Sequence, residues 1–312
     1  MSNRIPKPKA GQKKPGHKTH SQQTGGDPMH DLHKLLAKQK FESMEDVEAF
    51  MKEVSKGPIP QFEPEGDKER AEQMAYEAMQ LDDDDARDML DEALILDPDC
   101  IMAFAGLGAL EPNPAIALAL YERGIAIGSD TYFADDYLKE HTGHFWLIHE
   151  TRPFMECLKG IAESNFYLGR PFPAMTTWMH MLELNPNDNQ GVRFDLLAVL
   201  AGFGDQEEFP KFDKQYENDA AAATFFNRAL HAFTTQGPGP QVKKLLDQAM
   251  ERNAHVVPML MERDPDLQRP GGYMLGSKEE ALSYLSIAHM IWWGAPGAIE
   301  WLKRSAPAKG RK

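Results

Sequence analysis

The chain has 312 residues, of which 42% are hydrophobic and 26% charged, enough for one large or two modest domains with apolar cores. No apolar run approaches the ~20 residues of a membrane span, and the Lys- and Pro-rich N-terminus lacks the apolar segment of a signal peptide, so we expect a cytoplasmic protein that does not enter the membrane. The two cysteines, Cys100 and Cys157, are too few for a disulfide framework or a cysteine-based zinc site, and we expect both to be buried.

The net charge of −14 is unevenly distributed. Residues 1–28 carry six Lys or Arg and a single Asp, which leaves about −19 for the remaining residues. Because this segment has almost nothing to bury, we predict a disordered basic tail over 1–28, and a second short basic tail over 304–312. Such tails could bind nucleic acid or an acidic partner through their lysines, but without interleaved aromatic residues or an RNA motif the simpler interpretation is solvated chain ends.

Residues 29–56 have the spacing of amphipathic helices and form a predicted leading helical segment. Within it, Ser43 and Asp46 predict an N-cap and a capping box. The stretch 57–66 contains three prolines and two glycines, which predict a linker. The main domain is therefore expected over 67–303.

A repeated spacing within that domain indicates helical repeats. An alanine or valine is followed four positions later by a large residue and three positions after that by another buried-type residue. The spacing occurs at Ala86, Leu90 and Ala93, at Ala117, Tyr121 and Gly124, at Ala174, Trp178 and Met181, and at Val242, Leu246 and Ala249. Two of these helices end before a proline, Pro98 or Pro186, which stops the helix.

The domain also contains the pattern of the first helix of a tetratricopeptide unit, once after Pro98 and once before Pro186. It consists of a large residue and then a small one three to four positions later, seen at Phe104, Leu107 and Gly108 and at Leu158, Ile161 and Ala162. Small residues let paired helices approach closely, and large ones fill the space to the next pair. We predict an all-α fold, a tetratricopeptide-type helical-repeat solenoid that is regular over 153–188 and has degenerate repeats over 189–260.

The later elements are also predicted to be helical. One helix should end at Gly204, and another should open with a capping box of Ser277 and Glu280 and end at Gly294. Trp293 and Trp301 are expected to form a terminal packing layer.

Six strings of the sequence resemble landmarks of a bacterial tetratricopeptide-repeat family that is similar to the animal suppressor of tumorigenicity 7 protein. They are "GHFW" at 143–146, "ETRPFM" at 150–155, "LNPNDNQGVRF" at 184–194, "YENDAAA" at 216–222, "NAHVVPML" at 253–260 and "GSKEEALSY" at 276–284. The resemblance runs from about residue 30 to 302. It implies a helical-repeat interaction protein with no established chemistry to carry over, and it does not identify a partner.

The stretch 141–153 offers one alternative function. His141, His144, His149 and Glu150 are four groups able to ligate zinc or iron, and three of them could share a face if 135–149 were one helix. Gly143 interrupts the pattern, however, and the H-E-x-x-H arrangement is absent. The favoured interpretation is a joint between helices.

In that joint we expect Phe145 and Trp146 in the core, Thr151 as the N-cap of the next helix and Pro153 in its first turn. Glycine-rich phosphate loops and nucleophile elbows are missing from the sequence, so we predict a non-enzymatic scaffold without cofactor or metal. A peptide or helix of another protein should lie in its concave groove. The acidic body favours a basic partner, and the candidate binding residues are Glu150, Arg152, Trp146 and His144.

Overall fold

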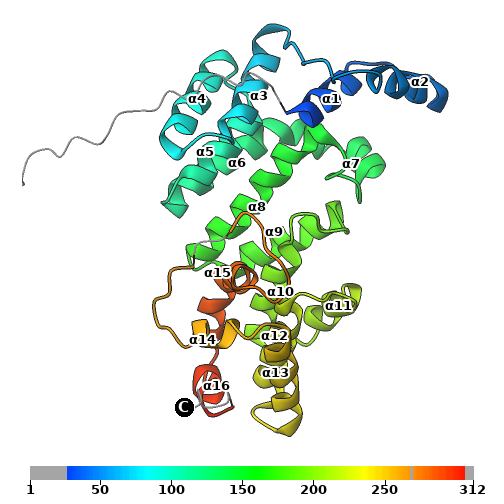
Figure 1. Ribbon diagram of the computed structural model, residues 1–312. Coiled ribbons are helices and arrows are strands. Elements are labelled where there is room, and N and C mark those ends of the chain that lie inside the picture. The colour runs from blue at the N-terminus through cyan, green and yellow to red at the C-terminus, as the bar shows by residue number, and fades with distance from the viewer. Residues whose placement is uncertain (1–26, 268–269, 306–312) are drawn as a thin grey trace, which may run out of the picture. The chain divides into compact units, whose positions relative to one another are not determined.

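The computed structural model describes residues 27–267 and 270–305 (Figure 1). These residues form sixteen α-helices and one 3-10 helix, and they include no strand. The all-α prediction is therefore confirmed for the described part. The predicted tail 1–28 lies outside the described residues up to residue 26, and Pro28 already begins a helix.

The chain divides into two compact units, Met1–Pro64 and Glu65–Lys312. The first unit contains α1 (Pro28–Ala37) and α2 (Met44–Val54). The capping box at the start of α2 is confirmed, because Ser43 Oγ accepts from Asp46 N and Asp46 accepts from Ser43 N. Phe41 packs edge-on against Phe50 with ring centroids 5.7 Å apart.

The second unit begins with three consecutive helix pairs, each formed by neighbouring antiparallel helices. They are α3 (Gly66–Ala78) with α4 (Asp83–Leu96), α5 (Ile101–Leu110) with α6 (Pro114–Tyr132), and α8 (Arg152–Tyr167) with α9 (Pro171–Leu184). Helix α3 starts at Gly66, one residue inside the predicted linker. The short α7 (Asp135–His141) and the 3-10 helix His149–Thr151 lie between α6 and α8 in the chain.

The predicted spacing of large and small residues explains how these pairs approach. All twelve of its residues are buried. The Tyr121 ring of α6 lies so close to two glycines that a Cβ on Gly108 would be 2.6 Å from it, and one on Gly160 2.2 Å. Tyr121 thus packs on the preceding helix α5 and on the following helix α8 at once, as the repeat argument requires.

The later helices depart from simple pairing. They are α10 (Val192–Phe203), α11 (Glu208–Gln215), α12 (Ala222–Gln236), α13 (Pro240–Arg252), α14 (Val256–Leu260), α15 (Lys278–Gly294) and α16 (Ala298–Ser305). Helix α10 ends at Gly204 as predicted, with φ +65°. Helix α12 packs on both α10 and α13, whereas α15 returns along the chain to pack on α10 and α12 (Figure 1). Helix α16 extends to Ser305, so the first two residues of the predicted tail 304–312 are helical and the rest lie outside the described residues.

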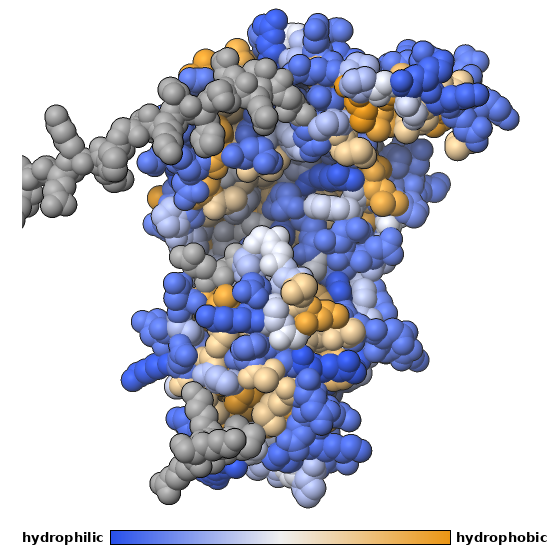
Figure 2. Space-filling view, in the orientation of Figure 1, coloured by the Kyte–Doolittle hydropathy of each residue, from blue (hydrophilic) through white to orange (hydrophobic). Residues whose placement is uncertain are grey.

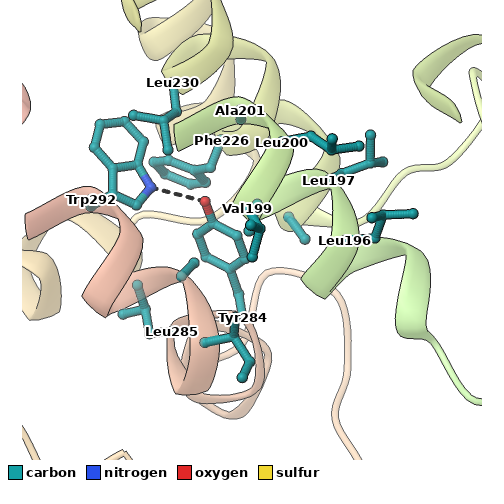
Figure 3. Close-up of a cluster of buried hydrophobic side chains, with 14 of the residues drawn as sticks. Leu196, Leu197, Val199, Leu200, Ala201, Phe226, Leu230, Tyr284, Leu285 and Trp292 are labelled. Carbon is teal, nitrogen blue, oxygen red and sulfur yellow. Dashed lines mark hydrogen bonds between the residues drawn. The ribbon is translucent and has the colours of Figure 1, made fainter. Parts of the chain in front are cut away.

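The contact of α10, α12 and α15 forms the centre of the largest apolar core (Figure 3). Buried Trp292 donates its Nε1 hydrogen to Tyr284 Oη at 2.9 Å. The Tyr284 hydroxyl donates to Asn227 Oδ1, and Asn227 Nδ2 donates to the carbonyl of Phe194. One chain of hydrogen bonds therefore ties the three helices together inside the core.

The predicted terminal layer needs one correction. Trp301 is buried and stacks on Phe233 with centroids 4.7 Å apart, but Trp293 is 38% exposed. Its neighbour Trp292 is the buried residue, because successive residues of a helix point about 100° apart. Both cysteines are buried, as expected. No helix of the described residues is long and apolar enough to cross a membrane.

Candidate functional site

The stretch 141–153 is a joint built from turns. Helix α7 ends at His141, turns follow, and Gly143 adopts φ +93°, so the premise of a single helix over 135–149 was wrong. The amides of Gly143 and Phe145 both donate to the carbonyl of Leu184, which fixes the joint to the end of α9. Phe145 is fully buried, as predicted, and Trp146 is half-buried against the same core.

The start of α8 differs from its prediction in one respect. Pro153 lies in the first turn as expected. Thr151 occupies the N-cap position as predicted, but its side chain makes no capping hydrogen bond: its hydroxyl donates to the carbonyls of Phe145 and Ile148. The reason is that the 3-10 helix leads directly into α8, so Thr151 has helical backbone angles and its side chain turns back to close the joint.

The four candidate ligands of the alternative metal site lie in different surroundings. His144 and Glu150 are exposed, and the His141 ring packs on Tyr137 with centroids 4.3 Å apart. His149 lines a cavity farther along the joint. Among the described residues, no three His, Cys, Asp or Glu side chains gather as ligands of one metal ion.

That cavity, which we call the α5 groove, has a volume of about 480 Å³ and is bordered by α3, α4, α5 and the start of α8. The first helix pair forms one wall of the groove, with Tyr76, Met79, Leu81 and Leu90. Helix α5 forms the floor, with Met102, Ala105, Gly106 and Ala109. The joint and the start of α8 form one end, with His149, Arg152, Pro153 and Glu156. Of the four candidate binding residues, Arg152 alone lines the groove, whereas Glu150, Trp146 and His144 do not.

The floor of the groove is an unusual helix face. Helix α5 has no polar side chain in its ten residues. Ala103, Leu107 and Gly108 are buried within the helix pairs, while the opposite face lines the groove. A helix that is apolar all round is ordinarily buried on every side. Within the second unit, one apolar face of α5 lines a cavity, and at its rim Met79 and Leu81 are 58% and 41% exposed.

Exposed apolar side chains also occur elsewhere on the second unit, among them Ile95, Phe172 and Met274. On the face that Figure 2 shows, most residues are hydrophilic, and apolar side chains appear in separate patches. Scattered exposed apolar residues are normal, whereas apolar residues gathered around a concave site are typical of binding surfaces.

Two charged groups shape the α8 end of the groove. The Arg152 guanidinium is oriented by the joint, since its Nε donates to the carbonyl of Trp146 at 3.0 Å and it lies over the Trp146 ring. Glu156, one turn further along α8, accepts from Gln190 Nε2 at 2.9 Å. Burial raises the pKa of the Glu156 carboxyl, so its protonated form is favoured more than in water.

A second cavity, of about 440 Å³, is polar and lies among α8, α10, α12 and α15. Arg193 bridges Asp188 and Asp219 at 2.7 and 2.6 Å. Asp188 also accepts from the amides of Val192 and Arg193, which caps α10. The sequence offered one signal for this cap, namely the residues just before Gly191. Gly191 has left-handed backbone angles and directly precedes α10.

Glu280 completes the wall of this cavity. Ser277 Oγ accepts from Glu280 N, which is half of the predicted capping box. The other half is wrong, because the Glu280 carboxylate accepts instead from the amides of Ala222 and Gly276 and from Asn253 Nδ2. It thereby caps α12, a helix 58 residues earlier. This network joins four of the sequence strings quoted above, namely 184–194, 216–222, 253–260 and 276–284. The carboxylates of Asp188, Asp219 and Glu280 in it all accept hydrogen bonds from the protein.

The chain was compared with protein-family models, with curated proteins and with solved structures, and no match was found in any of the three comparisons.

Proposed function

We propose that this chain is a non-enzymatic, cytoplasmic interaction scaffold that binds a peptide or helix of another protein in the α5 groove. The observation that carries the proposal is the apolar face of α5, which within the second unit lines a cavity of about 480 Å³. Burying such a face stabilises a complex by roughly 25 cal/mol per Å² of apolar surface before the costs of association are subtracted.

We further propose that the fold is a tetratricopeptide-type solenoid related to the suppressor of tumorigenicity 7 family. Consecutive antiparallel pairs, the shared spacing of large and small residues, and the contact of Tyr121 with two successive first helices support this assignment. In such an array the first helices of the pairs line the concave face. Helices α3, α5 and α8 are the first helices here, and all three contribute to the groove or its end.

In the second half of the array, a later helix of the same chain would cover the face that binds a partner in the first half. Helix α15 packs on α10 and α12, which are the corresponding first helices of the later pairs. Binding is therefore confined to the first three pairs. The net charge of −14 favours a partner that carries basic residues.

The test is affinity capture from native cell extract with two matched variants. Ala109→Trp fills the groove from the exposed end of α5, and Ala119→Trp adds the same bulk on the exposed side of α6, away from the groove. A partner retained by the wild type and Ala119→Trp but lost by Ala109→Trp would support the proposal. Equal retention by both variants would contradict it.

The same samples also test the alternatives. Metal near one equivalent in the purified chain would favour a metal protein that uses His141, His144, His149 and Glu150. An RNA mobility shift at low salt that disappears on deletion of residues 1–28 would favour a nucleic-acid-associated factor. We expect neither result.

A further inference from the structure

The kind of partner can be inferred from a comparison of α5 with α10. Both helices have faces that their neighbouring pairs do not cover. In α10 the six residues from Leu196 to Ala201 are all buried, because α15 lies against the helix on the side away from the pairs. The contact is close: a Cβ on Gly202 would lie 2.3 Å from a side-chain carbon of Ile291 on α15. This fold therefore covers an apolar first helix with another helix.

The floor of the α5 groove suits the same kind of cover. Ala105 and Ala109 have short side chains, so the axis of a docked helix can approach α5 closely at these positions, whereas Gly106 is packed by Leu90 of α4, 2.9 Å from where its Cβ would lie. The ten residues of α5 extend for about 15 Å at 1.5 Å per residue. A docked helix of about three turns would match that length.

The end of the groove at the C-terminus of α5 is acidic. Arg87 of α4 donates its Nη2 hydrogen to the carbonyl of Leu110, the last residue of α5. The first turn of α4 therefore lies at the C-terminal end of α5. Asp83, which lines the groove, begins that turn, and Asp84 and Asp85 follow it.

The other end carries the guanidinium of Arg152. Gly124 of α6 lies between the N-terminal turn of α5 and Cys157 of α8, because a Cβ placed on it would be within 3.6 Å of both helices. The residues that precede Cys157 in α8 therefore lie toward the N-terminal end of α5. Arg152 and His149 line the groove there together with Glu156, whose carboxyl group accepts a hydrogen bond from Gln190 and has a pKa raised by burial.

We infer that the α5 groove binds an amphipathic α-helix of about three turns from another protein, with an acidic residue at the end that meets Arg152 and a basic residue at the end that meets Asp83. This inference rests on the proposed function and narrows it. An apolar stripe at i, i+3, i+4 and i+7 would face α5, and the two charges would fix the direction of the helix.

The test uses a phage-displayed library of randomised 16-residue peptides, selected on the wild-type chain and depleted on Ala109→Trp. Selected peptides are synthesised and their dissociation constants measured with the wild type, Ala109→Trp, Ala119→Trp, Arg152→Glu and Asp83→Lys. Circular dichroism of each variant checks that it is folded, and transferred NOEs report the bound conformation of the peptide.

We expect helical peptides that lose binding with Ala109→Trp and keep it with Ala119→Trp. Arg152→Glu should weaken binding about tenfold, and replacing the peptide's acidic residue by Lys should restore it on that variant. Asp83→Lys should likewise weaken binding about tenfold, and replacing the peptide's basic residue by Glu should restore binding on that variant. The rescue is the decisive readout, because a merely destabilised groove would not be repaired by a charge change in the peptide.

Two other results would each have a distinct meaning. Peptides that depend on the groove but bind extended, or that ignore Arg152→Glu and Asp83→Lys, would overturn the helix inference and leave the scaffold proposal standing. A selection that yields no peptide sensitive to Ala109→Trp would overturn both.

Discussion

The helices α3–α9 and the helices α10–α16 use the same kind of pairing but end with opposite surfaces. In the first set, one apolar face of α5 lines a cavity. In the second, the equivalent helix α10 is buried from Leu196 to Ala201, because α15 returns to cover it. The difference shows that an apolar helix face can either complete a core or line a cavity, and that the return of a later segment decides between them.

The covered half also has the more extensive internal network. Its hydrogen bonds run from Trp292 through Tyr284 and Asn227 to the backbone of α10. Glu280 joins α15 to the start of α12. We therefore expect the second half to supply most of the stability of the repeat domain, and the first half to supply its binding surface.

The largest effect should follow from Trp292→Ala. Removing a fully buried tryptophan leaves a cavity and takes away one of the two hydrogen bonds of the Tyr284 hydroxyl, which should lower the free energy of unfolding by about 3–5 kcal/mol. Denaturant unfolding measures the change, and amide hydrogen exchange locates it. Loss of protection should be greatest in α10, α12 and α15.

The neighbouring Trp293→Ala is the matched control. Trp293 is 38% exposed and donates one hydrogen bond to the carbonyl of Leu260, so its loss should cost about 1 kcal/mol. If Trp292→Ala lowered protection equally in α3 and α4, the two halves would unfold as one unit and the contrast between them would be structural only.

The next largest effect should follow from Glu280→Ala. Its carboxylate accepts from two backbone amides and one side-chain amide inside the core. Leaving these donors unpaired should cost about 2–4 kcal/mol, and the Ala222 amide should exchange faster. Exposed Glu279→Ala, one residue earlier, should change stability by about 0.5 kcal/mol or less. Equal effects of the two variants would show that the link between α15 and α12 contributes nothing.

A smaller effect tests the close packing of helices within the first half. At Gly160 a Cβ would lie 2.2 Å from the Tyr121 ring, so Gly160→Ala should destabilise the chain by about 1–3 kcal/mol. Tyr121→Leu in the same chain should recover part of the loss by making room. A Cβ placed on Gly294 would meet no neighbour within 4 Å, and Gly294→Ala should therefore be tolerated. A fully tolerated Gly160→Ala would disprove the close approach.

The smallest effect concerns Glu156 in the wall of the α5 groove. Because burial raises its pKa, the folded state binds this proton more tightly than the unfolded state, and the free energy of unfolding should rise as the pH falls through the folded pKa. Glu156→Gln keeps an acceptor for Gln190 and removes the charge. The variant should be the more stable protein at neutral pH, and its advantage should vanish as the pH falls toward the ordinary glutamate pKa of about 4.3.

Thermal unfolding from pH 7 to pH 4 measures this difference. Glu122→Gln, on the exposed side of α6, controls for the loss of one carboxylate and should stay within about 0.5 kcal/mol of the wild type. A Glu156→Gln variant that is less stable at neutral pH would show that the attraction of Lys159 outweighs the cost of burial.

The sequence by itself determined the all-α class, several helix ends and the buried positions of the repeated spacing. These features depend on short-range signals: a helical period, an N-cap such as Ser43, or a terminator such as Gly204. The spacing that includes Ala174 and Trp178 correctly identified buried positions because a helix has the same period wherever it lies.

Only the tertiary structure decided which faces are covered and by what. The sequence did not reveal that α15 would cover α10, that Glu280 would cap α12, or that Arg152 would line a groove without Glu150. It also selected the wrong one of two adjacent tryptophans. The physical reason is that periodicity marks a face as apolar, but the segment that buries this face comes from a distant part of the chain. At α10 that segment is α15, whereas within the second unit one apolar face of α5 lines a cavity.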